Sequence, residues 1–310
     1  MINTLTLNPA IDKILYLDKI ERNITNRITD LAITIGGKGT HVSINLSQMG
    51  IGNRAFGFAY GGAGRYIINT LQSAGIDVHF LYDNDCESRT NTILIESDNS
   101  CTTIAERGPQ LKEKEFDGLI TLMGRIIQSG DIIVLSGDAS NCSDPFIYNR
   151  IVDEFADRSL KVVLDASGEY LRRGLECSPF MIKPNQDELE NLCGFSIEDD
   201  EDVLRGIDSL DRFGIEVIAV SLGGRGSIVR FGSECYKATP PKVEVRNTVG
   251  CGDSFLAALL FGFETGMSHT DMLKLATAVS AATAASSLSV GFDSELADSL
   301  ISVCKVERIK

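Results

Sequence analysis

A glycine-rich segment near the C-terminus carries the residues best suited to chemistry. It reads Asn247-Thr248-Val249-Gly250-Cys251-Gly252-Asp253-Ser254-Phe255 and leads into an apolar stretch typical of a helix. Gly250 and Gly252 let backbone N–H groups approach an anion, and a helix N-terminus is the positive end of its dipole. Asp253 could then take a proton from an attacking hydroxyl, so Gly250, Cys251, Gly252 and Asp253 are candidate catalytic residues for phosphoryl transfer. On spacing alone, a glycine turn with Asp253 as an ordinary helix cap is an equal alternative.

Asn185 and Glu188 form a second candidate group. They lie three residues apart at the expected start of a helix, so their side chains can face one way and hold Mg²⁺ through water. The alternative is an N-cap followed by a carboxylate in the first turn, which stabilises a helix without any ligand. Taken alone, the two residues favour the cap, and the metal role depends on the resemblance given below.

These residues need a scaffold of alternating strands and helices. Helical segments separate short apolar runs that are typical of buried parallel strands, at Ile132–Leu135, Val162–Leu164, Phe180–Ile182 and Val217–Val220. The pattern predicts an α/β fold with a doubly wound, mostly parallel sheet flanked by helices. A further strand is expected at Lys242–Val245, directly before the glycine-rich segment.

Two other regions, about 11–36 and 88–107, alternate apolar and polar residues and so favour strands with one solvated face. We expect them to form a small β-sheet lid within a single domain that spans residues 1–310. An exposed apolar face on such a sheet is costly, which suggests a homodimer formed through the lid sheets.

Composition excludes several classes of function. The formal net charge of −14 argues against a nucleic-acid-binding surface, which needs a basic face. The eight cysteines contain no CxxC pair, which favours reduced thiols in a cytoplasmic protein over a disulfide framework or a zinc site. The first residues lack the basic and apolar regions of a signal peptide, and no apolar run is long enough to suggest a membrane span.

Six landmarks, in order along the chain, resemble the PfkB or ribokinase family of carbohydrate kinases. The glycine-rich segment is similar to the family signature D-T-x-G-A-G-D-x-F, with Asn247 for the first acid and Cys251 for the alanine. The other five are an opening strand that ends in an aspartate, a glycine signature, a strand end of the hexose-phosphate branch, a K-P-N-x-x-E stretch and an S-L-G-x-x-G loop. They lie at Thr6-Leu7-Asn8-Pro9-Ala10-Ile11-Asp12, Gly36-Gly37-Lys38-Gly39, Val163-Leu164-Asp165-Ala166-Ser167-Gly168, Lys183-Pro184-Asn185-Gln186-Asp187-Glu188 and Ser221-Leu222-Gly223-Gly224-Arg225-Gly226.

The resemblance implies a ribokinase-like fold and an ATP-dependent kinase that uses Mg²⁺. It is strongest to the branch that includes 1-phosphofructokinase and tagatose-6-phosphate kinase, which implies a phosphorylated ketohexose as substrate. The implied substrate-binding residues are Asp12, Gly37, Lys38, His41, Arg89 and Asp138, with Arg89 suited to bidentate contact with a phosphate. The implied nucleotide-binding residues are Lys183, Ser221, Gly223, Gly226, Thr248, Ala282 and Ser286, and the implied metal ligands, through water, are Asn185 and Glu188.

Two departures from the family pattern bear on the substrate. His41 stands where the family usually has an asparagine that bonds a sugar hydroxyl. Asp138 follows Ser136-Gly137 where the branch usually has serine, and a carboxylate facing a phosphate is unfavourable. These departures keep two alternatives open, a kinase for an unphosphorylated sugar or a nucleoside, and a catalytically silent sugar-binding regulatory protein.

Overall fold

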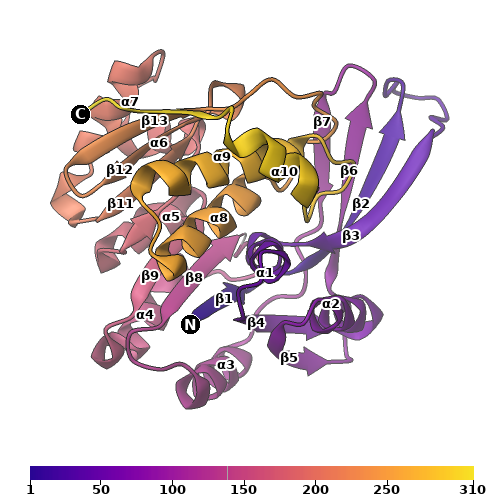
Figure 1. The fold of residues 1–310 in the computed structure, drawn as a ribbon. Coiled ribbons are helices and arrows are strands. Elements are labelled where there is room, and N and C mark those ends of the chain that lie inside the picture. Colours follow the sequence, from indigo (N-terminus) through magenta and orange to yellow (C-terminus); the bar gives the residue numbers. More distant parts are fainter. Residues whose placement is uncertain (138) are drawn as a thin grey trace.

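Two β-sheets organise the chain (Figure 1). The structure is a computed structural model that describes residues 1–137 and 139–310, so the expected role of Asp138 concerns a residue outside the described part. In the larger sheet the strand order is β14-β13-β12-β11-β10-β9-β8-β1-β4-β5. Its parallel strands are β5 (Asp77–Asp83), β4 (Asn53–Tyr60), β1 (Ile2–Thr6), β8 (Ile132–Gly137), β9 (Lys161–Ala166), β10 (Met181–Ile182) and β11 (Val217–Ser221).

Antiparallel strands complete one edge of this sheet. They are β12 (Ser227–Phe231), β13 (Glu234–Thr239) and β14 (Lys305–Arg308). The expected strand at Lys242–Val245 is wrong, because strand β13 ends at Thr239 and the following Pro240-Pro241 cannot donate ladder hydrogen bonds. The predicted α/β class with a doubly wound, mostly parallel sheet is confirmed.

Helices cover both faces of the larger sheet (Figure 1). One face packs against α3 (Glu113–Ile126), α4 (Ile147–Glu154), α5 (Gly168–Gly174), α6 (Gln186–Cys193) and α7 (Asp200–Asp208). The other packs against α1 (Lys38–Gln48), α2 (Gly61–Ser73), α8 (Cys251–Thr265), α9 (His269–Ala284) and α10 (Ser294–Ile301). Short 3₁₀ turns lie at Ala156–Arg158, Leu175–Cys177, Asp211–Phe213 and Gly223–Arg225.

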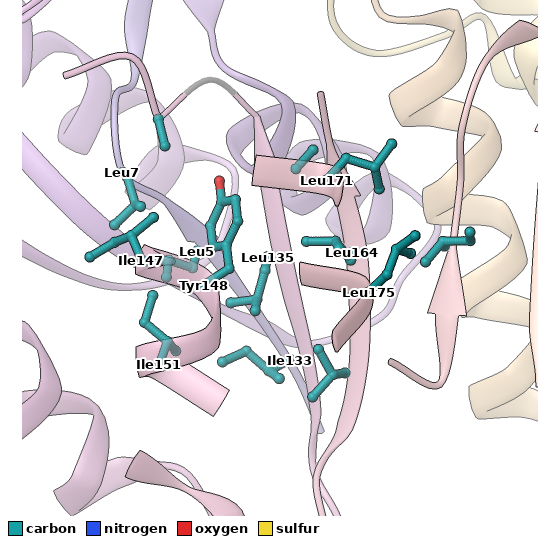
Figure 2. Close-up of a cluster of buried hydrophobic side chains, with 14 of the residues drawn as sticks. Leu5, Leu7, Ile133, Leu135, Ile147, Tyr148, Ile151, Leu164, Leu171 and Leu175 are labelled. Atoms are coloured by element: carbon teal, nitrogen blue, oxygen red, sulfur yellow. The ribbon is translucent and has the colours of Figure 1, made fainter. Parts of the chain in front are cut away.

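Tyr148 of helix α4 lies at the centre of the core on the first face (Figure 2). Its ring is buried among aliphatic side chains of β1, β8 and α4, including Leu5, Leu135 and Ile147. Burying each such side chain contributes about 1.5–3 kcal/mol, which holds these strands together beneath the site.

Small residues bring helices α8 and α9 close together on the second face. A Cβ atom at Gly262 would lie 2.5 Å from Cγ of Met272, so only glycine permits this approach. Ala257 and Ala278 are fully buried there. The close packing fixes the N-terminal end of α8, which begins at Cys251.

The small sheet has the order β3-β2-β6-β7 and stands beside the larger one (Figure 1). Its strands are β2 (Ala10–Leu17), β3 (Asp30–Gly36), β6 (Arg89–Glu96) and β7 (Cys101–Ala105), within the two regions expected for the lid. Its inner face buries Ile14 and Ile93 near Val249, whereas its outer face exposes apolar side chains. Hydrogen bonds from Tyr16 Oη to the Ser287 carbonyl and between the Thr34 and Ser289 hydroxyls tie the sheet to the turn that follows α9.

No helix in the described part of the chain is long and apolar enough to cross a membrane. All eight cysteines are free thiols.

Candidate active site

Asp12 lies on the inner face of the small sheet, where the chain enters strand β2. Its side chain is buried and accepts a 2.8 Å hydrogen bond from Nδ2 of Asn91 on the neighbouring strand β6. The position depends on Gly36, because a Cβ atom there would lie 2.1 Å from Asp12 Oδ1. The adjacent glycine, Gly37, is the N-cap of α1 with a φ of 110°, so the GGKG segment turns sharply from strand β3 into the helix.

His41 joins the carboxylates of Asp12 and Asp253. Its Nδ1 atom is 2.7 Å from Oδ2 of Asp253, and its Nε2 atom is 3.9 Å from Oδ2 of Asp12. Nε2 also lies 2.9 Å from the carbonyl oxygen of Ile35. Burial alone would lower the pKa of His41, but the hydrogen bond and charge of Asp253, with the charge of Asp12, raise it above its ordinary value. Because protein groups engage both ring nitrogens, the expected bond from His41 to a sugar hydroxyl has no support in this geometry.

Asp253 sits in the first turn of helix α8, and the turn before it is tightly constrained. Gly250 is the N-cap, with a φ of 82° that favours glycine. The N–H groups of Cys251 and Asp253 donate to the carbonyls of Thr248 and Gly250. Burial, with the nearby charge of Asp253, raises the pKa of the Cys251 thiol to about 12, so the thiol is neutral near pH 7.

Lys38 and Lys183 converge on the buried carboxylate of Asp165. Oδ1 of Asp165 lies 2.9 Å from Nζ of Lys38 and 3.3 Å from Nζ of Lys183. Burial would raise the pKa of this carboxyl, but the two ammonium groups hold it below its ordinary range. Nζ of Lys183 also approaches the start of α8, since a Cβ atom at Gly252 would lie 3.2 Å from it. The cluster therefore connects the GGKG segment to the glycine-rich turn. Its two ammonium groups and one carboxylate leave a net positive charge beside that turn.

A cleft of about 740 Å³ opens beside the glycine-rich turn at the start of helix α8. That volume is in the range of small-molecule sites. Seven expected residues line it, from the start of α6, the end of β11 and the loop after it, and the start of α8 with the turn before it: Asn185, Ser221, Gly223, Gly226, Thr248, Cys251 and Gly252. Thr277, Ala281 and Ala284 of helix α9 form another wall.

Three of the expected nucleotide-binding residues do not line this cleft. Ala282 is buried in the core between the larger sheet and helices α8 and α9, because the helix directs the side chains of its neighbour Ala281 and of Ala284 to the cleft instead. Ser286 lies in the turn after α9, where its hydroxyl accepts a hydrogen bond from the N–H of Leu288. Lys183 is buried behind the cleft, beside Gly252.

Asn185 and Glu188 form a capping box at the start of helix α6. Oδ1 of Asn185 accepts from the N–H of Glu188 at 2.8 Å, and Oε2 of Glu188 accepts from the N–H of Asn185 at 2.9 Å. The helix-cap alternative is thus realised in the structure. It does not exclude a metal role, because the carboxylate has a second oxygen and Asn185 lines the cleft.

Arg89 is buried at the start of strand β6. Its guanidinium donates to the carbonyl oxygens of Asn8 at 3.0 Å and of Glu106 at 3.3 Å. These contacts hold the side chain beside Asn8 in the loop after β1. Whether it binds a phosphate stays a prediction.

Residues 5–293 match the model of the pfkB family of carbohydrate kinases. The chain belongs to this family. It is therefore a carbohydrate kinase, and the family implies the use of ATP. It is 32% identical over 288 residues to 1-phosphofructokinase from Borreliella burgdorferi, which covers 92% of each chain.

Solved structures of related proteins support the fold of this kinase. A Staphylococcus aureus protein provisionally named a phosphofructokinase is 30% identical, with a TM-score of 0.82 over 100% of this chain and 99% of that one. Phosphofructokinase-2 from Escherichia coli, in complex with fructose-6-phosphate, is 23% identical, with a TM-score of 0.86 over 97% and 98% of the two chains.

Several residues at the site of this kinase have no role predicted from the sequence. Asp165 stands at the carboxyl end of a buried strand, where parallel sheets gather functional groups, so its position was a usable signal. Asn91, the partner of Asp12, and the α9 residues Thr277, Ala281 and Ala284 had no comparable signal.

Proposed function

We propose that this kinase transfers the terminal phosphoryl group of ATP to a hydroxyl of a phosphorylated ketohexose, with Asp253 as the base. The observation that carries the proposal is the position of Asp253 between two compartments. Its carboxylate contacts His41, whose other ring nitrogen lies 3.9 Å from the carboxylate of Asp12, whereas the preceding Cys251 and Gly252 line the cleft. An alcohol and a nucleotide tail can therefore meet at the first turn of helix α8.

The proposed reaction is direct transfer without a phosphoenzyme. The acceptor hydroxyl gives its proton to Asp253 while its oxygen attacks the phosphoryl group. The helix N-terminus and the ammonium group of Lys183 supply positive charge beside Gly252, where negative charge develops. The small sheet, tied to Ser287 and Ser289, would limit the access of water to this point.

We propose that Mg²⁺ binds near Asn185 and Glu188 through water. Their amide and carboxylate oxygens are the ligand type that Mg²⁺ prefers, and the ion commonly keeps several waters. In the described residues, no three His, Cys, Asp or Glu side chains gather into a closed metal site, which fits an ion held mainly by nucleotide phosphates. When bound, the ion would neutralise phosphate charge. Chelation should abolish turnover, and Glu188→Gln should raise the Mg²⁺ concentration needed for half-maximal rate.

Support for a sugar-phosphate substrate comes from the similarity to the Borreliella 1-phosphofructokinase and from the arginine at position 89. The test is a coupled assay of ATP consumption with fructose 1-phosphate, fructose 6-phosphate, tagatose 6-phosphate and their unphosphorylated sugars. We expect turnover of at least one hexose phosphate and little of the plain sugars. Turnover of ribose or a nucleoside alone would select the kinase for an unphosphorylated acceptor, and no consumption with any acceptor would favour a silent binding protein.

The base is tested by Asp253→Asn, which keeps the size of the side chain but removes its basicity. We expect kcat to fall by about 10²- to 10⁴-fold with ATP binding retained. Asp298→Asn, an exposed aspartate on helix α10, is the matched control and should leave kcat unchanged. A near wild-type rate for the first variant would remove Asp253 from the mechanism.

We further propose a homodimer formed through the outer face of the small sheet. Leu31 and Ile33 of strand β3 are each 47% exposed on that face, and Ile104 of strand β7 is 60% exposed. Covering this apolar area would be favourable. Light scattering at micromolar concentration should give a dimer that Ile33→Asp converts to a monomer. Val303→Asp, at an exposed valine after helix α10, should not change the mass.

A further inference from the structure

Each ring nitrogen of His41 faces an oxygen that accepts hydrogen bonds. The carbonyl oxygen of Ile35, 2.9 Å from Nε2, can only accept a hydrogen bond. Nε2 must therefore carry a hydrogen, which would leave Nδ1 of a neutral imidazole with a bare lone pair. That lone pair would face Oδ2 of Asp253 at 2.7 Å. The contact is a hydrogen bond only if one further proton lies between the two atoms.

The surroundings decide where this proton resides. Strand β2 contributes the carboxylate of Asp12, 3.9 Å from Nε2, and helix α8 contributes the carboxylate of Asp253, 2.7 Å from Nδ1. On the histidine's own helix, the ammonium of Lys38 is committed to Asp165. Two carboxylates thus face one buried imidazole, and their field raises the pKa of His41 although burial opposes it. The arrangement favours an imidazolium that donates from both nitrogens.

We infer that His41 is a positioning residue for the proposed base: as an imidazolium it holds Oδ2 of Asp253, so that Oδ1 is the oxygen presented to the acceptor hydroxyl. This inference rests on the proposed function of Asp253. The imidazolium also offsets the charge of two carboxylates that share a buried space. An asparagine at position 41, the residue usual in the family, has both of its N–H donors on one nitrogen, so it could not donate from two separate ring positions and could not supply that charge.

The inference has a pH signature with a definite sign. The pKa of His41 lies above its ordinary value of about 6.5, so the imidazolium is present below the raised pKa and is lost as the pH rises through it. Once Nδ1 is deprotonated, its lone pair and the carboxylate repel each other and Asp253 loses its fixed orientation. Wild-type kcat should therefore fall as the pH rises through this raised pKa, and a variant without an imidazole should lack that titration.

The first experiment follows the ring directly, without turnover. The chain has three histidines, so nitrogen NMR of isotope-labelled histidine can resolve them in the intact protein. We expect one imidazolium with both nitrogens protonated, whose pKa lies above the ordinary histidine value of about 6.5. Asp253→Asn should lower that pKa, whereas Asp77→Asn, at the half-exposed partner of His79, should not. A pKa of His41 at or below about 6.5, or a titration that Asp253→Asn leaves unchanged, would overturn the inference.

The second experiment measures kcat and KM of His41→Asn across the pH range. We expect kcat to fall by about 100-fold with KM for the sugar little changed, and the titration of kcat that depends on the imidazolium to disappear. His79→Asn is the matched control and should keep the wild-type profile. A rise in KM at constant kcat would make His41 a substrate-binding residue and reject the positioning role. If instead Asp253→Asn retains turnover while the NMR result holds, the proposed base fails and the His41–Asp253 ion pair stands.

Discussion

The carbonyl oxygen of Ser289 lies against the α-carbon of Gly250, where a Cβ atom would approach it to 1.9 Å. Ser289 also bonds Thr34 of the small sheet through its hydroxyl. The turn before Asp253 is therefore clamped between helix α8 and the small sheet. A side chain at position 250 has to move one of these elements.

We therefore expect Gly250→Ala to lower kcat strongly while it lowers the free energy of unfolding only modestly. The left-handed backbone, with a φ of 82°, costs an alanine about 1–2 kcal/mol, and the clash with Ser289 displaces the turn as well. We expect a fall in kcat of about 100-fold. Gly130→Ala is the control for backbone strain, because its φ is 83° and a Cβ atom there meets no atom within 4 Å. Equal kcat values in the two variants would contradict the role assigned to the clamp.

Gly36→Ala should weaken binding of the sugar substrate. The new methyl group would lie 2.1 Å from Oδ1 of Asp12 and would displace this carboxylate from its contact with Asn91. Because a hydrogen bond to a charged group contributes about 1.5–3 kcal/mol, KM for the sugar should rise about 10- to 100-fold, with KM for ATP unchanged. Gly52→Ala, which meets no atom within 4 Å, should leave both constants at wild-type values. A matching rise in KM for ATP would point to a general distortion instead.

Local patterns were sufficient to predict the fold class and the helix cap at Asn185. Apolar runs identify buried strands, and a capping residue with its partner three positions later is a local signal. The strand expected at Lys242–Val245 was wrong because the preceding Pro240 and Pro241 lack the N–H groups that would continue the ladder.

Contacts between distant segments could not be predicted in the same way. The His41–Asp253 bond joins residues 212 positions apart, and no local pattern encodes it. Ala282 shows a second reason why the site could not be fully predicted. Successive residues of a helix point about 100° apart. An error of one position therefore moves a side chain from the cleft to the core, as the neighbouring Ala281 demonstrates.

Asp165→Asn should strongly destabilise the protein. It would leave the ammonium groups of Lys38 and Lys183 beside a neutral amide, and removing one partner of a buried ionic cluster costs about 3–5 kcal/mol. Chemical denaturation should show this loss in the free energy of unfolding. Asp208→Asn, which breaks the exposed pair with Lys310, should cost no more than about 1 kcal/mol.

The same carboxyl gives the stability a defined pH dependence. The folded-state pKa of Asp165 lies below its ordinary value of about 3.9, so its contribution is complete above that value and is lost as the pH falls through the folded-state pKa. Wild-type stability should therefore decline in acid more steeply than that of Asp165→Asn. Parallel acid profiles for the two proteins would show that the cluster does not stabilise the fold through this charge.

Ala284→Phe should obstruct the nucleotide end of the proposed site. Ala284 is half-buried on helix α9 and lines the cleft, so a benzyl group there occupies space that the nucleotide needs. We expect KM for ATP to rise about tenfold or more, the effect of losing about 1.4 kcal/mol of binding, while KM for the sugar is unchanged. Ala285→Phe adds the same group one position along, at a half-buried residue outside the cleft lining, and should leave KM for ATP near the wild-type value. If both variants raise KM for ATP equally, the effect comes from disturbing α9, and the cleft is not where ATP binds.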